Sequence, residues 1–456
     1  MSVSVLVLSA EPVAERMAGP AIRAAELARA LAGAGHRVTL ASPGGSTPEA
    51  GVSGLDAGFE DFDALVAAAA DHDVLVAQEL PPTLLARLRK LPVRVALDLY
   101  NPIVMEVLEA VAGERPRVQR RIQRLIGSRA LAQCAVADFI VCASERQRDL
   151  WLGAMSVNGL IDLDLYGRDP TLRSLIDVVP FGLPDAPPPS AGEPVMKGVL
   201  PGIAPDDRVL LWAGGIWGWL DPATPIRAAG LLAADSGPAI HLVFMGTGRP
   251  GLERTGQSAY PDRARELARR EGLDGTLVHF NEGWVPYEER GRWLAEADLG
   301  VSAHLDSLEA RFSFRTRILD YLWARLPVVT TGGDALGDLV ERERLGRAVP
   351  PGDAEAFAAA CRELLEGRAG SDARKRIDAL APSLRWNEVT APLAEWCERA
   401  PGLPPRTAHA GVLRRAAIGQ YARIVPETLR TNGPVAAGRQ VGRRLRRALS
   451  PRGRGR

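Results

Sequence analysis

The sequence predicts two Rossmann-like α/β domains with parallel sheets that face a central cleft, followed by a basic C-terminal tail. Short apolar strand candidates alternate with amphipathic helices, which is typical of parallel sheets covered by helices on both faces. The pattern stops at the proline-rich segment 183–189 and then starts again. At 456 residues, the chain is long enough for each domain to bury a core of its own. Ligands of such sheets bind beyond the carboxyl ends of the strands, so we expect the site in the cleft.

The predicted strands form two series of short apolar runs. Those of the first domain are 3–9, 37–41, 73–78, 93–97, 138–143 and 177–180. Those of the second domain are 208–213, 240–246, 276–280, 298–303 and 327–331. The predicted division of the chain is 1–183 for the first domain, 184–206 for a linker, 207–382 for the second domain, 383–400 for a closing helix and 401–456 for the tail.

Charge is unevenly distributed along the chain. From Pro401 onward there are 13 arginines and one acidic residue, Glu427, whereas the first 400 residues carry a net charge of −11. Basic tails of this kind meet phosphate groups, so we predict that residues 401–456 contact an anionic membrane surface. The tail has one aromatic residue, Tyr421, and therefore no stacking platform for nucleic acid. A disordered basic tail without a partner is the open alternative.

The segment 117–129 is a second candidate for membrane contact. Its arginines fall on one side of the predicted helix and its apolar residues on the other. An ordinary surface helix is the alternative. The first residues form a strand candidate without a basic leader, and the four cysteines are scattered. Both features favour a cytoplasmic protein, peripheral on the inner membrane face if the tail binds lipid.

Glycine-rich loops follow several predicted strands. Gly214, Gly215 and Trp217 follow the strand 208–213, and an aromatic ring there is suited to wall a nucleotide or a sugar. Packing of one tryptophan in the core is the alternative. Gly246 and Val285 follow the next two strands and are predicted as further walls of the donor site.

The segment 304–323 is the most informative stretch. Ser313 is the predicted N-cap of a helix whose buried face is Ile318, Leu319, Leu322 and Leu326. Arg315 and Arg317 lie in the first turn, where the helix dipole disfavours positive charge. A diphosphate bound by both guanidinium groups and by free amides near Thr316 would resolve this conflict. The alternative is that the arginines pair with Glu309 or Asp306.

The sequence predicts no metal site. Asp162 and Asp164 form a lone acidic pair of a kind that is common in loops, and the six histidines are not clustered. Only His304 falls in a candidate site loop, and a lone histidine is usually structural.

Several motifs, in this order and spacing, resemble the family 4 retaining glycosyltransferases of the GT-B fold over roughly residues 1–400. The points of likeness are Gly19 with its following helix, Ala-Gly-Ala-Gly-His-Arg-Val at 32–38, Val-Val-Pro-Phe-Gly at 178–182 and Leu-Pro-Val-Val-Thr-Thr at 326–331. The segments 332–334 and 349–353 add to the likeness. The stretches 19–23, 214–217 and 314–317 look like a bacterial subgroup involved in surface polysaccharide assembly.

The chain departs from the family at three places. The family's two glutamates fall at Phe312 and Asp320, and Glu309 lies three residues before the first. The family's basic pair for the diphosphate falls at Gly215 and Leu220. Our hypothesis is that Arg315 and Arg317 supply the missing charge. Asp98 stands where many members have an active-site histidine.

The resemblance implies transfer of a sugar from a nucleotide-sugar donor to a glycan or lipid-linked acceptor, with retention and without a required metal or other cofactor. It assigns the donor ribose to Asp320, the sugar hydroxyls to Glu309 and the base to backbone near Val285. It places the acceptor against Gly19, Arg23 and Asp98. Two alternatives remain: a GT-B-fold sugar-nucleotide epimerase, and a catalytically inactive subunit that binds a sugar nucleotide.

Overall fold

The computed structural model describes residues 2–14, 17–45, 51–187, 192–234, 236–247, 259–283, 285–404, 406, 411–413 and 415–416. The chain divides into two compact units. The N-terminal unit is built mainly from residues 20–179 and is completed by residues from 391 onward. The C-terminal unit is built mainly from residues 180–390.

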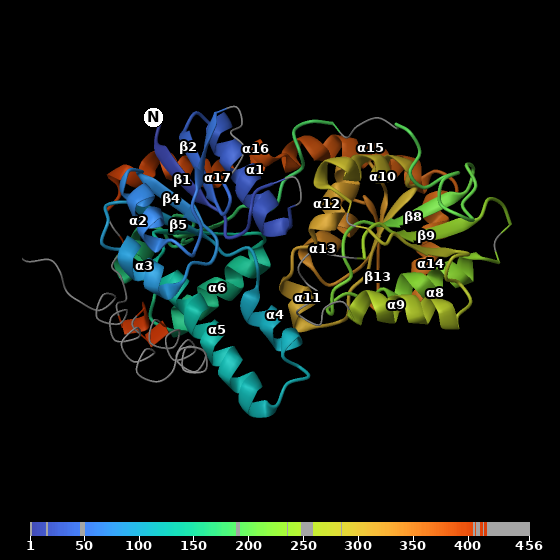
Figure 1. Cartoon of the computed structure of the whole chain (residues 1–456), viewed down its shortest axis with the longest axis horizontal. Coiled ribbons are helices and arrows are strands. Elements are labelled where there is room, and N and C mark those ends of the chain that lie inside the picture. The colour runs from blue at the N-terminus through green and yellow to red at the C-terminus, as the bar shows by residue number, and fades with distance from the viewer. Residues whose placement is uncertain are drawn as a thin grey trace, which may run out of the picture. The chain divides into compact units, whose positions relative to one another are not determined.

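The N-terminal unit contains a seven-stranded parallel sheet with helices on both faces (Figure 1). Its strand order is β3-β2-β1-β4-β5-β6-β7, with β1 Ser4–Leu8, β2 Arg37–Ser42, β3 Val52–Asp56, β4 Val74–Ala77, β5 Arg94–Asp98, β6 Phe139–Cys142 and β7 Ile176–Val178. Its helices are α1 Gly19–Gly33, α2 Phe62–Ala70, α3 Pro82–Leu88, α4 Ile103–Ala110, α5 Pro116–Val136, α6 Glu145–Val157 and α7 Leu163–Arg168. Strands β1, β4 and β6 are buried along their whole length, as expected of a sheet covered on both faces.

The C-terminal unit contains a six-stranded parallel sheet of order β10-β9-β8-β11-β12-β13. Its strands are β8 Arg208–Trp212, β9 Ile240–Phe244, β10 Val278–Phe280, β11 Leu299–Ser302, β12 Val328–Thr331 and β13 Gly346–Val349. Its helices are α8 Ala223–Leu232, α9 Ala259–Arg270, α10 Arg290–Glu296, α11 Leu308–Phe312, α12 Thr316–Trp323, α13 Ala335–Arg342, α14 Ala354–Leu365, α15 Ala369–Leu380 and α16 Trp386–Val389. Short 3₁₀ turns lie at Tyr287–Glu289 and Ala381–Leu384.

These two parallel sheets confirm the predicted fold class, and every predicted strand is present with its ends shifted by no more than two residues. Two strands were not predicted, β3 and β13. Both lie at a sheet edge, and only Val52 of β3 is fully buried, so β3 lacks the apolar run of a central strand. Strand β13 begins at Gly346, where a Cβ atom would lie 1.8 Å from the carbonyl oxygen of Val328.

The predicted helix 383–400 is wrong as a single helix. The chain forms α16, turns at Thr390 and then forms α17, Ala391–Arg399. Pro392 explains the break, because it has no amide hydrogen and its ring would clash with the carbonyl of residue 388 in a continuous helix. Helix α17 belongs to the N-terminal unit, where the Trp396 ring stacks on Phe139 with centroids 5.0 Å apart.

Arg406 fastens the chain after α17 to the N-terminal unit. Its guanidinium donates to the carbonyl oxygens of Cys134 at 2.7 Å, Ala137 at 3.1 Å and Leu160, and burial lowers its pKa. Ala416 is fully buried. The described residues up to Ala416 are therefore part of this unit. Most of the predicted membrane tail 401–456, including all of it from residue 417 onward, lies outside the described residues. Within the part of the chain that the structure describes, no helix is long and apolar enough to cross a membrane.

A buried chain of polar groups joins the amino-terminal ends of β9 and β10. His241 lies between Asp207 and His279, at 3.0 Å from the Asp207 carboxylate and 3.1 Å from the His279 ring nitrogen. Burial lowers the pKa of His279 below its ordinary value of 6.5, and the charge of His241 acts in the same direction, whereas Asp274 and a hydrogen bond to Thr276 oppose it. The folded chain therefore favours neutral His279.

This arrangement predicts an acid-sensitive C-terminal unit. Because the unfolded chain binds the proton more readily, the stability that neutral His279 contributes is present above its ordinary pKa and is lost as the pH falls below it. We expect the unfolding midpoint to drop between about pH 7.5 and pH 5.5, and to drop less in a His279→Gln variant. Differential scanning calorimetry of both proteins measures this. An equal drop in the two proteins would contradict the role of His279.

Candidate functional site

The strand order of the C-terminal unit reverses between β8 and β11, which is where open α/β sheets bind their ligands. The loops that follow these two strands are joined edge to edge. The amide of Asp221 donates to the carbonyl of Ala303 at 3.0 Å, and that of Leu305 donates to the carbonyl of Trp219 at 3.3 Å. The predicted glycine loop and the predicted arginine segment are thus neighbours in the fold.

Tyr321 fixes helix α12 beneath these loops. Its hydroxyl donates to the carbonyl of Val301 at 2.7 Å and accepts from the amide of Ala213 at 2.9 Å. Its ring fills the space beside Gly300, where a Cβ atom would lie 2.2 Å from the ring. The fully buried tyrosine therefore joins the start of the glycine loop to the end of β11.

Arg317 lies under the glycine loop without a carboxylate partner. Its Nη2 donates to the carbonyl of Gly215 at 3.0 Å, and the guanidinium lies over the Trp212 ring, 4.6 Å from the centroid. Burial lowers the pKa of Arg317 to about 10 and the charge of Arg315 acts in the same direction, whereas the charges of Tyr321 and Asp320 oppose this shift. Among the described residues, no carboxylate lies within ion-pair distance of it, and its buried Nη1 has no hydrogen-bond partner. Arg317 as a whole is partly buried, but a buried donor without a partner is costly unless an anion binds there.

Arg315 has the opposite environment, because it is already paired. Its Nη2 lies 3.1 Å from Oε2 of Glu309, and both residues are buried. The predicted alternative of pairing with Glu309 therefore holds for Arg315 and not for Arg317. The Nε of Arg315 is buried and has no hydrogen-bond partner among the described residues.

The prediction that Ser313 caps the next helix is wrong. Ser313 ends α11, and Arg315 is the N-cap of α12 without a capping side-chain hydrogen bond. The Ser313 hydroxyl donates instead to Oε1 of Glu309, and a hydrogen bond to a charged group is stronger than one to a helix amide. Thr316 is the first residue of α12, as expected of a helix-start residue, and the predicted buried face is confirmed, with Ile318, Leu319, Leu322 and Leu326 all buried.

A network around His304 was not predicted as a site. Its Nδ1 lies 2.6 Å from the Thr331 hydroxyl and its Nε2 lies 3.0 Å from Oδ2 of Asp334. Burial acts to raise the pKa of Asp334, but the hydrogen bond and charge of His304 and the charge of Arg315 outweigh it, so the pKa is lowered. Asp334 also caps α13 by accepting from the amides of Leu336 and Gly337. The family-like segment 326–334 was the available signal, but it did not indicate His304 as the partner.

Asp320 is held on α12 by Arg290. The carboxylate accepts from Nε of Arg290 at 3.0 Å, and the guanidinium lies over the rings of Tyr287 and Trp323. Burial raises the pKa of Asp320, and the charges of Arg290 and Arg317 only partly offset it. Asp320, which was predicted to bind the donor ribose, is therefore a carboxylate that already pairs with Arg290.

The glycine loop has the conformation that its residues require. Gly214 has a φ of +101°, which favours glycine. A Cβ atom on Gly215 would lie 3.0 Å from the Trp217 ring, so Gly215 makes room for that ring. Trp217 in turn stacks on Trp219, with centroids 6.1 Å apart. Trp217 is half-buried at the loop, where one face of its ring is suited to meet a ligand.

The next two loops are also joined at this edge of the sheet. Asn281 donates to the carbonyl of Met245 at 2.7 Å, and the Thr247 hydroxyl donates to the carbonyl of Asn281 at 2.9 Å. Gly246 therefore lies beside the loop that leads to Val285, as its position after β9 predicts. Trp284 lies outside the described residues.

In the N-terminal unit, Arg23 and Asp98 form a buried ion pair. Nε of Arg23 lies 2.6 Å from Oδ2 of Asp98, and Nη2 lies 2.9 Å from Oδ1 and 2.7 Å from the carbonyl of Val179. Arg23 is 0% exposed, and burial raises the pKa of Asp98 although Arg23 opposes this. Both residues were predicted to lie against the acceptor, and in the structure they bind each other. Gly19 is the first residue of α1, with open space where a Cβ atom would be.

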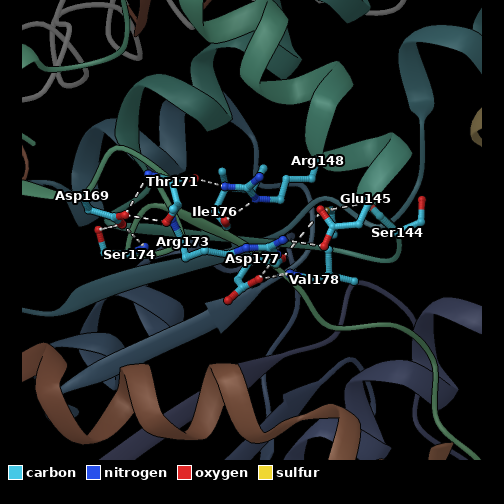
Figure 2. A network of polar contacts seen from close by, with 11 residues as sticks. Ser144, Glu145, Arg148, Asp169, Thr171, Arg173, Ser174, Ile176, Asp177 and Val178 are labelled. Atoms are coloured by element: carbon cyan, nitrogen blue, oxygen red, sulfur yellow. Dashed lines mark hydrogen bonds and ion pairs between the residues drawn. The ribbon is translucent and has the colours of Figure 1, made fainter. Parts of the chain in front are cut away.

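A second network fixes the loop that leads to Val179. Figure 2 shows Arg173 between Glu145 and Asp177, and Asp169 accepting from Thr171 and Ser174. Hydrogen bonds to these two side chains outweigh burial, so the pKa of Asp169 is lowered. The contacts hold β7 and thereby the carbonyl that accepts from Arg23.

The acidic pair at 162–164 has a structural role. Asp162 caps α7 by accepting from the amides of Asp164 and Leu165, and these hydrogen bonds lower its pKa. Within the described parts of the chain, no group of three or more histidine, cysteine or acidic side chains is placed to hold a metal ion.

With this geometry in place, comparison with known proteins identifies the second half of the chain. Residues 207–367 match the family described as glycosyl transferases group 1. These residues are a group 1 glycosyltransferase domain. The fold is that of GT-B glycosyltransferases, and the chain is a glycosyltransferase. No curated protein matches this sequence.

Solved structures of low sequence identity share the fold. The structure of Anabaena Alr3699/HepE in complex with UDP-glucose is 14% identical, with a TM-score of 0.57, covering 88% of this chain and 100% of that one. WaaG, a glycosyltransferase involved in lipopolysaccharide biosynthesis, is 16% identical, with a TM-score of 0.53 and coverage of 86% and 98%. A trehalose-6-phosphate synthase studied for glycosyltransfer with retention is 13% identical, with a TM-score of 0.59 and coverage of 89% and 100%.

The position of Tyr321 leads to a prediction about stability. A Tyr321→Phe variant leaves a buried amide and a buried carbonyl unpaired, which costs about 1–3 kcal/mol for each group. We expect a lower free energy of unfolding by urea, monitored by tryptophan fluorescence. Tyr166→Phe is the matched control, because Tyr166 is 50% exposed and its loss should leave stability almost unchanged. Equal stability of both variants would contradict the role of Tyr321.

Proposed function

We propose that the enzyme transfers a sugar from a nucleotide-sugar donor to a glycan or lipid-linked acceptor, with retention at the anomeric carbon. The observation that carries this proposal is Arg317. Its buried Nη1 lacks a hydrogen-bond partner among the described residues, at the strand-order reversal of the glycosyltransferase domain.

The chemistry of the leaving group supports the assignment. When the anomeric C–O bond of a nucleotide sugar breaks, negative charge builds on the leaving diphosphate. A guanidinium held in place by Gly215 and Trp212 stabilises that charge without reorganising during the reaction. The positive end of the α12 dipole lies on the same side and favours negative charge there.

The family's basic pair for the diphosphate is replaced here by Gly215 and Leu220. We propose that Arg317 supplies most of the missing positive charge. Arg315 neutralises Glu309, and together they shape the loop wall that is assigned to the sugar hydroxyls. Related folds support a uridine nucleotide as the first donor to test, because Alr3699/HepE was crystallised with UDP-glucose. Retention is supported by the motifs in the sequence and by the trehalose-6-phosphate synthase fold.

The acceptor is proposed to be attached to lipid at the inner membrane face, in a polysaccharide pathway. The charge contrast along the chain supports this proposal, because an acidic body joined to an arginine-rich tail 401–456 orients the enzyme toward an anionic surface. Arg406 and Ala416 fix the start of this tail on the N-terminal unit, which is assigned to the acceptor.

A panel of sugar nucleotides tests the donor assignment. Because a ligand that binds only the folded chain raises its stability, the donor nucleotide should raise the unfolding midpoint in a concentration-dependent manner. Transfer is then measured as release of nucleoside diphosphate in the presence of acceptor candidates. If none of the sugar nucleotides raised the unfolding midpoint, the result would contradict the proposed function.

Separate substitutions of the two arginines distinguish their roles. Arg317→Ala should weaken donor binding by at least tenfold, because charge-assisted hydrogen bonds contribute about 1.5–3 kcal/mol, and should change stability little. Arg315→Ala leaves Glu309 buried without its cation and should lower the free energy of unfolding by about 3–5 kcal/mol. Isothermal titration with the stabilising sugar nucleotide and urea denaturation measure the two effects.

Matched variants make this comparison specific. Arg342→Ala removes an exposed arginine of the same unit and should bind the donor as the unchanged chain does. The double variant Arg315→Ala, Glu309→Gln should recover part of the stability lost in Arg315→Ala, because the unpaired charge is gone. Normal donor binding by Arg317→Ala would sink the assignment of the diphosphate to Arg317.

A further inference from the structure

We propose that the α4–α5 hairpin, residues 103–126 of the N-terminal unit, docks on an anionic lipid surface. This inference rests on the proposed function in one respect, the lipid-linked acceptor, and it names a surface other than the tail. Figure 1 shows α4 and the first half of α5 projecting together from the unit. The last two turns of α5 are buried in its core, including Ala130, Cys134 and Val136.

Helix α5 carries positive charge only. Its 21 residues, Pro116–Val136, include five arginines and no acidic residue. The acidic residues of the hairpin, Glu106, Glu109 and Glu114, lie on α4 and the turn. The first 400 residues together have a net charge of −11, so this helix is a basic element on an acidic body. Such a distribution orients a protein toward an anionic surface.

The arginines of the projecting part are free to meet an external partner. Those that are exposed are Arg115, Arg117, Arg120, Arg121 and Arg124. None of their side chains forms an ion pair or a hydrogen bond with another described residue. Some exposed arginines elsewhere, such as Arg325 and Arg269, are held by carboxylates, and the α5 arginines differ in being clustered on one element. Folding of the N-terminal unit therefore does not explain four unpaired basic side chains on the first turns of α5 and a fifth, Arg115, at its N-cap.

Apolar side chains accompany this charge. Val118 on α5 is 36% exposed and Leu108 on α4 is 37% exposed, while Ile122, Leu125 and Ile126 are partly buried. Basic and apolar groups on one projecting element suit the interface between lipid headgroups and acyl chains. Neither helix nor the turn between them contains an aromatic residue on which a base could stack, so the surface favours lipid over single-stranded nucleic acid.

Vesicle flotation of the full chain tests this proposal. The vesicles are phosphatidylcholine alone or phosphatidylcholine with phosphatidylglycerol. The variant changes Arg117, Arg120, Arg121 and Arg124 to Gln. Since each basic residue near an anionic membrane contributes about 1 kcal/mol, we expect partitioning onto the phosphatidylglycerol vesicles to fall by about 100-fold or more.

Two matched variants separate this surface from bulk charge and from the tail. The first changes four exposed arginines of the C-terminal unit to Gln: Arg270, Arg344, Arg368 and Arg376. This variant loses as much positive charge as the α5 variant, and its flotation with the vesicles should equal that of the unchanged chain. The second changes Arg439, Arg443, Arg444, Arg446 and Arg447 of the tail to Gln, and should keep the part of the binding that α5 supplies.

The outcomes are distinct. Loss of flotation in the α5 variant, with flotation kept in the C-terminal control, supports the proposal. Flotation of the α5 variant equal to that of the unchanged chain overturns it, as does binding of single-stranded RNA in place of vesicles. Donor binding by the α5 variant is measured in parallel and should be normal. Absence of donor binding in the unchanged chain would contradict the proposed function without altering the flotation result.

Discussion

The candidate donor site depends on how its buried and partly buried charges are paired. Glu309 is bound by Arg315, Asp320 by Arg290, and Asp334 by His304 and two helix amides. In the part of the chain that the structure describes, Arg317 completes this group as a partly buried arginine that forms no ion pair and whose Nη1 is buried without a hydrogen-bond partner. An unpaired buried donor is costly, which supports the proposal that an anion from outside binds there.

The framework around this charge is held by hydrogen bonds between the ends of strands. Tyr321 joins the ends of β8 and β11, and Asp221 and Leu305 join the loops that follow them. Strand order reverses between β8 and β11, and open α/β sheets bind their ligands at the carboxyl ends of strands at such a reversal. Tyr321 and the glycines of the loop after β8 thus determine where the Arg317 guanidinium lies. Because the nearby carboxylates are bound by other cations, this guanidinium is available to an anionic ligand.

The sequence was sufficient to predict the two α/β domains, because the central strands are continuous apolar runs that few other structures accommodate. Edge strands such as β3 were not predictable in this way, since one buried residue gives no pattern. The site was predicted in part. Glycine after β8 and arginine at the start of α12 were recognisable, but Arg315 and Arg317 are equivalent in sequence. Their difference comes from Gly215, which is 102 residues away, and from Glu309. His304 and Asp334 were missed because the contact between them joins two loops.

We propose that Nη1 of Arg317 binds the leaving diphosphate. A crystal structure of the enzyme with a nucleoside diphosphate tests this assignment directly. We expect a phosphate oxygen within hydrogen-bond distance of Nη1, with the guanidinium still over Trp212 and Arg315 still bound to Glu309. A complex in which the phosphates lie away from Arg317, or in which Arg315 leaves Glu309 to bind them alone, would contradict it.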